Sequence, residues 1–349
     1  MRAMVLTGIR SMEMQEVPDP TLQNKKDVLI RMTTVGVCGS DVHYYVSGKI
    51  GTQVVKFPFP VGHEGAGIVQ DVGADVTGVK PGDRIAIEPA MPCWTCDQCL
   101  AGRPHTCRNL SFLGCPDQAD GCLTEKIVMP ESSCFKISES MTLDEAALSE
   151  PLSIGVYAVQ QSIPMQDATV GILGAGPIGL SVLLPAKAQG AKKIYVTDKL
   201  DERLALARQV GASWTGNPNH EDVVATVHKV QPDELDVVFE CCGQQEALTQ
   251  AIGMLKPGGK LMIVGIPQVE EVSFSISQMR HKEITIRNVR RQCHCVQPAL
   301  DMIDNKALDV AFMVTHRFPF EKTQDAFDLV ADYRDGVIKA VIDFPQTCG

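Results

Sequence analysis

The sequence has no stretch that concentrates lysine and arginine, no low-complexity segment and no internal repeat. Its 32 Lys and Arg residues are outnumbered by 42 Asp and Glu residues, so the formal net charge is −10 at pH 7. That balance disfavours binding to a nucleic acid or to an anionic membrane surface. We therefore expect the binding partner to be a small molecule.

The N-terminus lacks the long apolar region and the small-residue cleavage site that are typical of a secretion signal. Its apolar run is interrupted by Arg10 and Glu13, and we interpret residues 1–14 as a first β-strand. Thirteen cysteines without a secretion signal argue against a disulfide framework and favour reduced thiols, some of them metal ligands. The predicted compartment is the cytoplasm.

Residues 168–186 carry no charge, and a segment of that length is able to span a bilayer. The segment contains Pro177, Pro185 and four glycines, which a lone lipid-facing helix would not tolerate well. A buried strand, a turn and a helix explain the same apolarity. Pro185 is then expected to kink that helix, at a cost of about 3 kcal/mol unless it lies near a bend.

The length of 349 residues favours two domains. The first 150 residues or so are predicted to be largely β, with short strands at 27–37, 65–73 and 83–90. Strands and helices then alternate from about 168 to 289, which predicts βαβ units on a parallel sheet. The tail is predicted to contain helices near 298–305 and 321–330 and a strand at 339–344.

A glycine-rich turn follows the first strand of the alternating region. Gly174, Gly176 and Gly179 form a GxGxxG pattern, and Asp198 ends the next strand. The glycines alone also fit a tight turn in an ordinary α/β domain, but the strand, helix and acid together favour a dinucleotide site. The acid predicts NAD rather than NADP, while Lys199 and Arg203 leave some tolerance of NADP open.

Four cysteines lie within fifteen residues: Cys93, Cys96, Cys99 and Cys107. Two-residue gaps allow successive thiolates to surround one tetrahedral ion, and four thiolates leave no open position for substrate. The spacing therefore predicts a structural zinc, against the alternative of four unrelated buried cysteines.

A second set of metal-ligand types is scattered along the first domain: Cys38, His63, Glu64 and Glu150. One thiolate, one imidazole and one carboxylate would leave a fourth position open, as a catalytic zinc requires. On spacing alone, separate structural roles for these residues are the stronger alternative.

Taken together, these motifs resemble those of the zinc-containing medium-chain dehydrogenase family. The resemblance rests on GHExxGxxxxxGxxV from Gly62 to Val76, with the cysteine cluster and the GxGxxG pattern. The runs that start at Cys38, Glu150 and Val314 narrow it to the sorbitol (L-iditol/xylitol) dehydrogenase branch. It implies an α/β two-domain fold, in which a GroES-like catalytic domain accompanies a doubly wound Rossmann sheet. The implied ranges are 1–154 for the catalytic domain, with the structural zinc lobe at 90–110, 155–289 for the NAD-binding domain and 290–349 for a segment that returns to the catalytic domain.

The resemblance also implies a role for individual residues. Cys38, His63 and Glu64 would ligate the catalytic zinc, with Glu150 either a further ligand or the holder of the metal-bound water. Ser40 and His43 would carry the alcohol proton toward solvent. Substrate contacts are expected at Tyr44, Glu150 and Arg291. Cofactor contacts, besides the three glycines, are expected at Ile178, Asp198, Arg203, Val264, Gly265, Ile266, Val289 and Arg291.

The implied activity is oxidation of a secondary hydroxyl of a sorbitol- or xylitol-like polyol to the ketose, by hydride transfer to NAD. Two zinc ions per chain and a homotetramer are implied as well. Gln292 and Tyr45 stand where many sorbitol dehydrogenases carry Tyr and Trp, which leaves the preferred polyol open. L-Threonine 3-dehydrogenase, a sugar-phosphate dehydrogenase and a non-catalytic NAD-binding protein are the alternatives.

Overall fold

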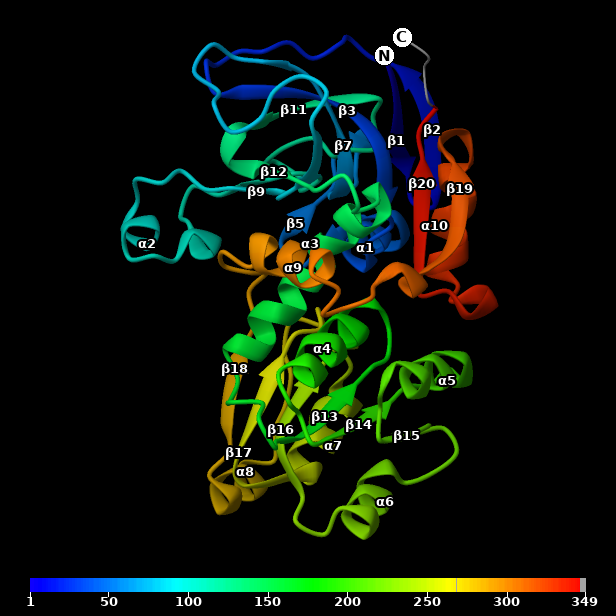
Figure 1. The fold of residues 1–349 in the computed structure, drawn as a ribbon. Helices are drawn as coiled ribbons and strands as arrows, with labels where there is room; N and C mark the ends of the chain where they lie inside the picture. Colours follow the sequence, from blue (N-terminus) through cyan, green and yellow to red (C-terminus); the bar gives the residue numbers. More distant parts are fainter. Residues whose placement is uncertain (268, 346–349) are drawn as a thin grey trace. The chain divides into compact units, whose positions relative to one another are not determined.

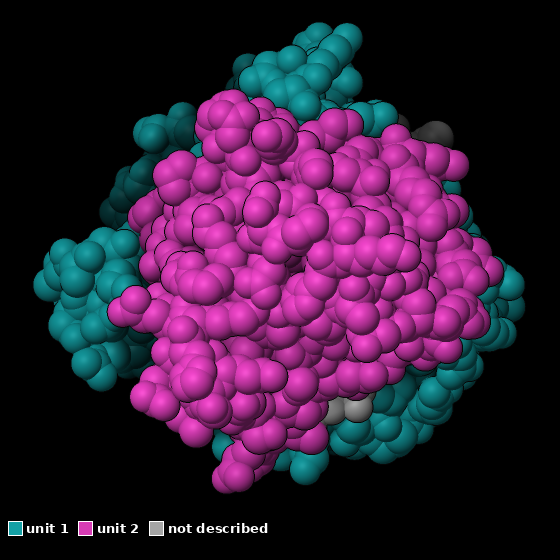
Figure 2. Space-filling view, turned by 90° about the horizontal axis from the view of Figure 1, so that it is seen from below, with its two compact units in different colours: residues 1–150, 296–349 teal, residues 151–295 magenta. Residues whose placement is uncertain are grey.

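The computed structural model describes residues 1–267 and 269–345 (Figure 1). The chain divides into two compact units, which Figure 2 colours separately. Unit 1 comprises Met1–Glu150 and the chain from Val296 onward, and unit 2 comprises Pro151–Cys295. The sequence analysis places these two boundaries at 154/155 and 289/290.

Unit 2 is built on one parallel sheet in the order β15-β14-β13-β16-β17-β18. This is the doubly wound order of a Rossmann fold, and it confirms the predicted fold class. The strands are β13 (Thr169–Leu173), β14 (Lys193–Thr197), β15 (Trp214–Gly216), β16 (Leu235–Glu240), β17 (Leu255–Ile263) and β18 (Thr285–Asn288).

The helices of unit 2 connect these strands. They are α4 (Pro177–Ala188), α5 (Asp201–Val210), α6 (Val223–Val230), α7 (Gln245–Met254) and α8 (Ile276–Lys282). The uncharged segment 168–186 forms β13, a turn and most of α4, as expected. No helix within the described residues is long and apolar enough to cross a membrane.

Helix α4 continues past Pro185 to Ala188. Proline has no N–H, so it cannot donate to the carbonyl oxygen of Ser181 one turn earlier. Gly155, on helix α3 (Leu143–Gln160), packs against this turn, and a Cβ atom there would lie 1.8 Å from the Ser181 oxygen. The missing side chain at Gly155 thus allows α3 and α4 to approach closely.

Unit 1 is organised around a sheet in the order β12-β8-β7-β3-β20-β19, with β11 also paired to β3. Its first-half strands are β3 (Asp27–Gly36), β7 (Glu64–Val72), β8 (Arg84–Ile87), β11 (Lys126–Pro130) and β12 (Cys134–Lys136). Smaller pairings involve β4 (Lys49–Ile50) with β5 (Gln53–Val54), β9 (Ala90–Met91) with β10 (Ser111–Phe112), and β1 (Arg2–Gly8) with β6 (Phe59–Pro60).

Two local expectations for unit 1 were wrong or incomplete. Residues 1–14 do not form one strand, because Arg10, at φ 52°, turns the chain between β1 (Arg2–Gly8) and β2 (Ser11–Glu16). The sequence analysis also did not identify α1 (Gly39–Ser47) and α3 in this mainly β region.

The chain after Val296 joins unit 1 through two strands. Strand β20 (Lys339–Asp343) pairs antiparallel with β3, with Val341 opposite Gly36, and β19 (Val314–Pro319) pairs with β20. Two helices, α9 (Val296–Asp304) and α10 (Thr323–Ala331), accompany them. Strand β20 therefore lies inside the sheet, between β3 and β19, although it is the last strand among the described residues.

The close approach at Gly155 gives a stability prediction. Gly155→Ala should lower the free energy of unfolding by roughly 1–3 kcal/mol, because the added Cβ overlaps the Ser181 carbonyl oxygen. Urea denaturation followed by circular dichroism measures this loss. Gly8→Ala is the matched control, since its Cβ would lie 3.8 Å from the Cβ of Ser11, an ordinary van der Waals contact, and its φ is not positive. A Gly155→Ala variant as stable as Gly8→Ala would contradict the packing described.

Candidate active site

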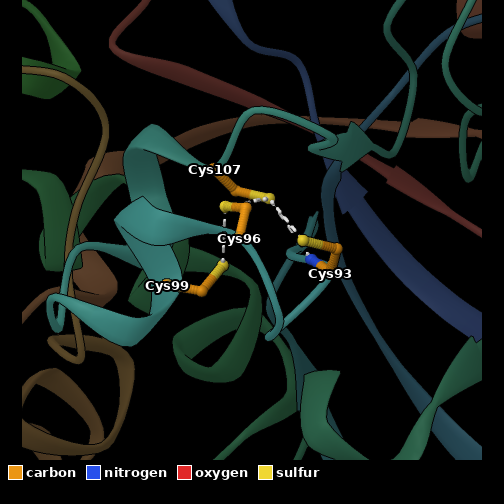
Figure 3. A group of neighbouring side chains, drawn as sticks. All are labelled: Cys93, Cys96, Cys99 and Cys107. Carbon is orange, nitrogen blue, oxygen red and sulfur yellow. Dashed lines mark hydrogen bonds between the residues drawn. The ribbon is translucent and has the colours of Figure 1, made fainter.

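The four cysteines of the predicted structural zinc site converge in one lobe of unit 1 (Figure 3). Their sulfur atoms all lie within 4.8 Å of one another. The lobe contains the short helix α2 (Asp97–Leu100), and its base is the pair of strands β9 and β10. In Figure 1 this segment extends away from the sheet of unit 1. Helix α2 has no buried residue, so the lobe has little apolar core of its own.

The electrostatics of the cluster fit a cation. Hydrogen bonds from Thr95 and the backbone lower the pKa of Cys93 to about 5. Burial and the neighbouring sulfur atoms raise the pKa of Cys99 to about 12. Four thiols this close cannot all ionise without a positive charge between them, and zinc supplies that charge while accepting four sulfur ligands.

Cys38, His63 and Glu64 also come together in unit 1, with ligand atoms within 4.8 Å of one another. Cys38 is the residue before α1, where its backbone is extended. Glu64 begins β7 and lies opposite Gly36 of β3, while His63 immediately precedes that strand. Pairing of β3 with β7 thus brings three donors from distant parts of the sequence into one group, which fits a metal ion.

Asp41 orients the imidazole of this group, although the sequence analysis assigned it no role. Its Oδ1 lies 3.2 Å from His63 Nδ1 and accepts a hydrogen bond of 3.3 Å from the Gly62 N–H. Burial lowers the pKa of His63, but the charges of Asp41 and Cys38 outweigh it and raise that pKa well above its usual range. A carboxylate on the second ring nitrogen is the usual support for a histidine that ligates a metal.

Glu64 is held by a lysine that the sequence analysis also did not identify. Lys339 Nζ donates to Glu64 Oε1 at 2.8 Å and to Oε2 at 2.6 Å, and both side chains are at most 2% exposed. Burial lowers the pKa of Lys339, but the neighbouring charge of Glu64 outweighs it and raises the pKa.

Glu150 lies near this group without belonging to it. Burial raises the pKa of Glu150 to about 8, with the charges of Glu64 and Glu88 adding to the rise and that of His63 opposing it. Among the described residues, the donor group within 4.8 Å contains only Cys38, His63 and Glu64.

Helix α1 carries the remaining predicted residues of unit 1. Ser40 Oγ donates to Cys38 Sγ at 3.3 Å, and His43 is half-buried, with its pKa lowered by burial. Tyr44 is buried, and its hydroxyl donates to Gln53 Oε1 at 3.3 Å and lies 3.7 Å from Cys115 Sγ. Tyr44 therefore connects α1 to β5 and to the loop that contains Cys115, and its predicted contact with substrate stays a prediction.

In unit 2, the glycine-rich turn has the form that close approach of a pyrophosphate requires. Gly174 has φ 104°, and a Cβ on Gly179 would lie 1.8 Å from the Gly174 carbonyl oxygen. Asp198 Oδ2 accepts a hydrogen bond of 2.7 Å from the Ala175 N–H, which joins the turn to the end of β14. The guanidinium of Arg203 is close to the same turn, 3.2 Å from where a Cβ on Gly176 would lie.

The other predicted cofactor residues lie at the same carboxyl edge of the parallel sheet. Val264, Gly265 and Ile266 follow β17, and the N–H of Val289, after β18, donates to Ile263 O at 2.8 Å. Ile178 lies in the first turn of α4, and Arg291 follows β18 in the left-handed region at φ 53°. Parallel strands bring these positions together because their carboxyl ends meet at one edge.

Glu240, the last residue of β16, is a further buried group at this edge. Its Oε1 accepts hydrogen bonds from the N–H groups of Cys242 at 2.8 Å and Gly243 at 2.5 Å. It thus fixes the loop after β16 beside the glycine-rich turn, where a Cβ on Gly174 would lie 3.0 Å from the Cys242 Cβ. The sequence analysis gave no signal for Glu240.

Two family models match the chain, one in each half. The alcohol dehydrogenase GroES-like domain matches residues 24–139, and the zinc-binding dehydrogenase model matches residues 177–305. The sorbitol dehydrogenase of Bacillus subtilis (strain 168) is 35% identical over 343 residues, which cover 98% of this chain and 97% of that protein. The chain belongs to the zinc-containing medium-chain dehydrogenase family, in its sorbitol dehydrogenase branch.

Two further likenesses agree with this membership. The L-idonate 5-dehydrogenase of Vitis vinifera is 34% identical over 333 residues, covering 93% of this chain and 90% of that protein. An Escherichia coli oxidoreductase/dehydrogenase of unknown specificity has a crystal structure that matches with a TM-score of 0.94, at 33% identity and 99% coverage of both chains. As a member of this family, the protein is an NAD- and zinc-dependent dehydrogenase.

We predict that the four-cysteine zinc supports stability rather than turnover. Cys99→Ser should lower the zinc content by one ion per chain and lower the melting temperature, because a closed tetrahedral site loses a ligand. Elemental analysis and calorimetry measure the two effects. Cys134→Ser, at a half-buried cysteine outside both donor groups, is the control and should keep its zinc. A stable, fully loaded Cys99→Ser variant would refute the site.

The two glutamates should differ in their effect on the catalytic zinc. Glu64→Gln should lose zinc and activity together, because it replaces a ligand. Glu150→Gln should keep most of its zinc and turn over slowly, since changes beyond the ligands cost only about 10- to 100-fold in affinity. Metal content and initial rates distinguish them. Zinc retained in Glu64→Gln and lost in Glu150→Gln would reverse the assignment.

Asp198 should set the choice between NAD and NADP. Asp198→Ala should weaken NAD binding by roughly 10- to 100-fold, because hydrogen bonds to a charged group contribute about 1.5–3 kcal/mol. It should also relieve the repulsion of the NADP phosphate. Calorimetric titration with both cofactors measures this, with Glu202→Ala, an exposed acid of α5, as the control. Equal affinity of the unmutated protein for both cofactors would contradict the prediction.

Proposed function

We propose that this protein oxidises a secondary hydroxyl of a sorbitol- or xylitol-like polyol to the corresponding ketose. The observation that carries the proposal is the donor group of Cys38, His63 and Glu64, which leaves a fourth ligand position available to an oxygen atom. Glu150, rather than the cysteine of the alcohol dehydrogenases, lies beside this group. A carboxyl group there favours a substrate with several hydroxyl groups. The sorbitol and L-idonate dehydrogenases among the relatives support the same substrate class.

The chain supplies orientation and proton transfer. When bound, zinc polarises the substrate oxygen as a Lewis acid and NAD accepts a hydride. Ser40 lies next to the donor group through its hydrogen bond to Cys38. His43, from the same helix, has its pKa lowered by burial and is neutral near pH 7, so it can accept the proton that the alcohol loses. Ser40 and His43 therefore form the proposed route of the proton to solvent.

The supporting residues keep the donor group in place. Asp41 fixes the ring of His63, and the ring of Phe112 lies 5.4 Å from it, centroid to centroid. In unit 2 the glycine-rich turn and Asp198 bind the adenosine end of the cofactor in this proposal. Tyr44, Glu150 and Arg291 are the proposed contacts of the polyol.

A substrate panel tests the proposal. NADH formation is followed with sorbitol, xylitol, L-iditol, L-threonine, galactitol 1-phosphate and ethanol, together with metal analysis. The proposal expects the free polyols to give the highest kcat/KM. Preference for threonine or for the sugar phosphate would overturn it in favour of another family activity. Binding of NAD without turnover of any alcohol would indicate a non-catalytic protein.

The family resemblance also supports a homotetramer with two zinc ions per chain. Sedimentation velocity of the zinc-loaded protein tests the first, and elemental analysis tests the second. Cytoplasmic location stays a prediction from the sequence.

A further inference from the structure

Lys339 is a buried cation whose hydrogen-bonding capacity is fully used inside unit 1. Besides its two contacts with Glu64, its Nζ donates to Val37 O at 3.1 Å. An ammonium has three N–H donors and no acceptor, so these three partners account for all of them. In the proposed function, this lysine takes no part in proton transfer or in binding of the substrate.

The backbone around Lys339 is built to present it to Glu64. Val37 N donates to Ala340 O at 2.9 Å, which fixes the start of β20 against the end of β3. A Cβ on Gly36 would lie 2.3 Å from Glu64 Oε2, so the glycine leaves space for the carboxylate to reach the lysine. Strands from the two ends of the chain thus enclose one ion pair.

Glu64 therefore faces two positive partners. It belongs to the donor group of the proposed catalytic zinc, and both of its oxygens already accept hydrogen bonds from Lys339. A carboxylate offers about four lone-pair positions, enough for both partners at once. However, two cations near one buried carboxylate repel each other strongly, because the interior screens charge weakly.

We propose that Lys339 is a positioning residue that acts as the counter-cation of Glu64 and lowers the retention of the catalytic zinc. In the zinc-free protein it neutralises a carboxylate that would otherwise be buried without a charge partner. In the zinc-loaded protein its charge repels the ion and keeps Glu64 exchangeable. The proposal rests on the proposed function, because it requires a zinc held by Glu64.

Zinc release from the holoenzyme to a chromogenic chelator, 4-(2-pyridylazo)resorcinol, tests the proposal. Lys339→Met should slow release of the catalytic zinc by about tenfold or more, because the repelling charge is gone. Lys339→Arg should release it at close to the unmutated rate. Zinc at the four cysteines is the internal control, since the rate of its release should not change. Release of the two zinc ions should give two kinetic phases, and the phase that is missing in Cys99→Ser belongs to the four-cysteine site.

Lys282→Met separates this effect from simple loss of a lysine that is hydrogen-bonded to a carboxylate and to backbone carbonyl oxygens. Lys282 in α8 likewise donates to a carboxylate, Glu234, at 2.8 Å and to backbone carbonyl oxygens, but it lies in unit 2. Its replacement should lower the melting temperature without slowing zinc release. If Lys339→Met is too unstable to purify, Lys339→Gln also removes the charge and should slow release in the same direction.

Two results would overturn the proposal in distinguishable ways. Catalytic zinc that leaves Lys339→Met as fast as, or faster than, it leaves the unmutated protein would show that Lys339 has a structural role only. An unmutated protein that holds only the zinc at the four cysteines would overturn the proposed catalytic zinc itself, and the proposal with it. Slower release of both zinc ions from Lys339→Met would indicate a general effect on the stability of the protein, and this result would also contradict the proposal.

Discussion

The contact between Lys339 and Glu64 constrains much of unit 1. Two opposite charges that are at most 2% exposed are stable together only when neither partner is lost, since a single buried charge left alone is costly. The pair therefore requires β20 to lie beside β3 and β7 to begin at Glu64. The same strand pairing brings Cys38 and His63 to that carboxylate. The metal donors and the sheet are thus specified by one set of contacts.

In unit 2, backbone geometry rather than a buried ion pair determines the form of the site. Six parallel strands end at one edge, where the loops that follow them meet. Two acids organise them. Asp198 accepts from the glycine-rich turn, and Glu240 accepts from the loop after β16. The backbone of both loops is therefore held in place before a cofactor binds, which lowers the entropic cost of binding.

Features encoded within a short stretch of sequence could be predicted, and features that depend on distant pairing could not. The βαβ alternation, the turn at Gly174 and the four-cysteine cluster are each local, and the structure contains all three. Lys339 is 275 positions from Glu64, so no spacing rule connects them. Asp41 stands within a motif that was identified, but its contact with His63 depends on how α1 packs. Helix α1 was not predicted, because its nine residues are too few to show a clear helical periodicity.

The discontinuity of unit 1 has a consequence for synthesis on the ribosome. Residues 151–295 emerge before β20 does, so unit 2 can fold while the sheet of unit 1 still lacks the strand that joins β3 to β19. Until then, the end of β3 from Thr34 to Gly36 lacks its β20 partner and is open to pairing with other chains. Before β20 is synthesised, Glu64 also lacks Lys339, so its carboxylate is either solvated or bound to another cation. A nascent chain that stalls before residue 339 would therefore present both an unpaired strand edge and a Glu64 without its lysine partner.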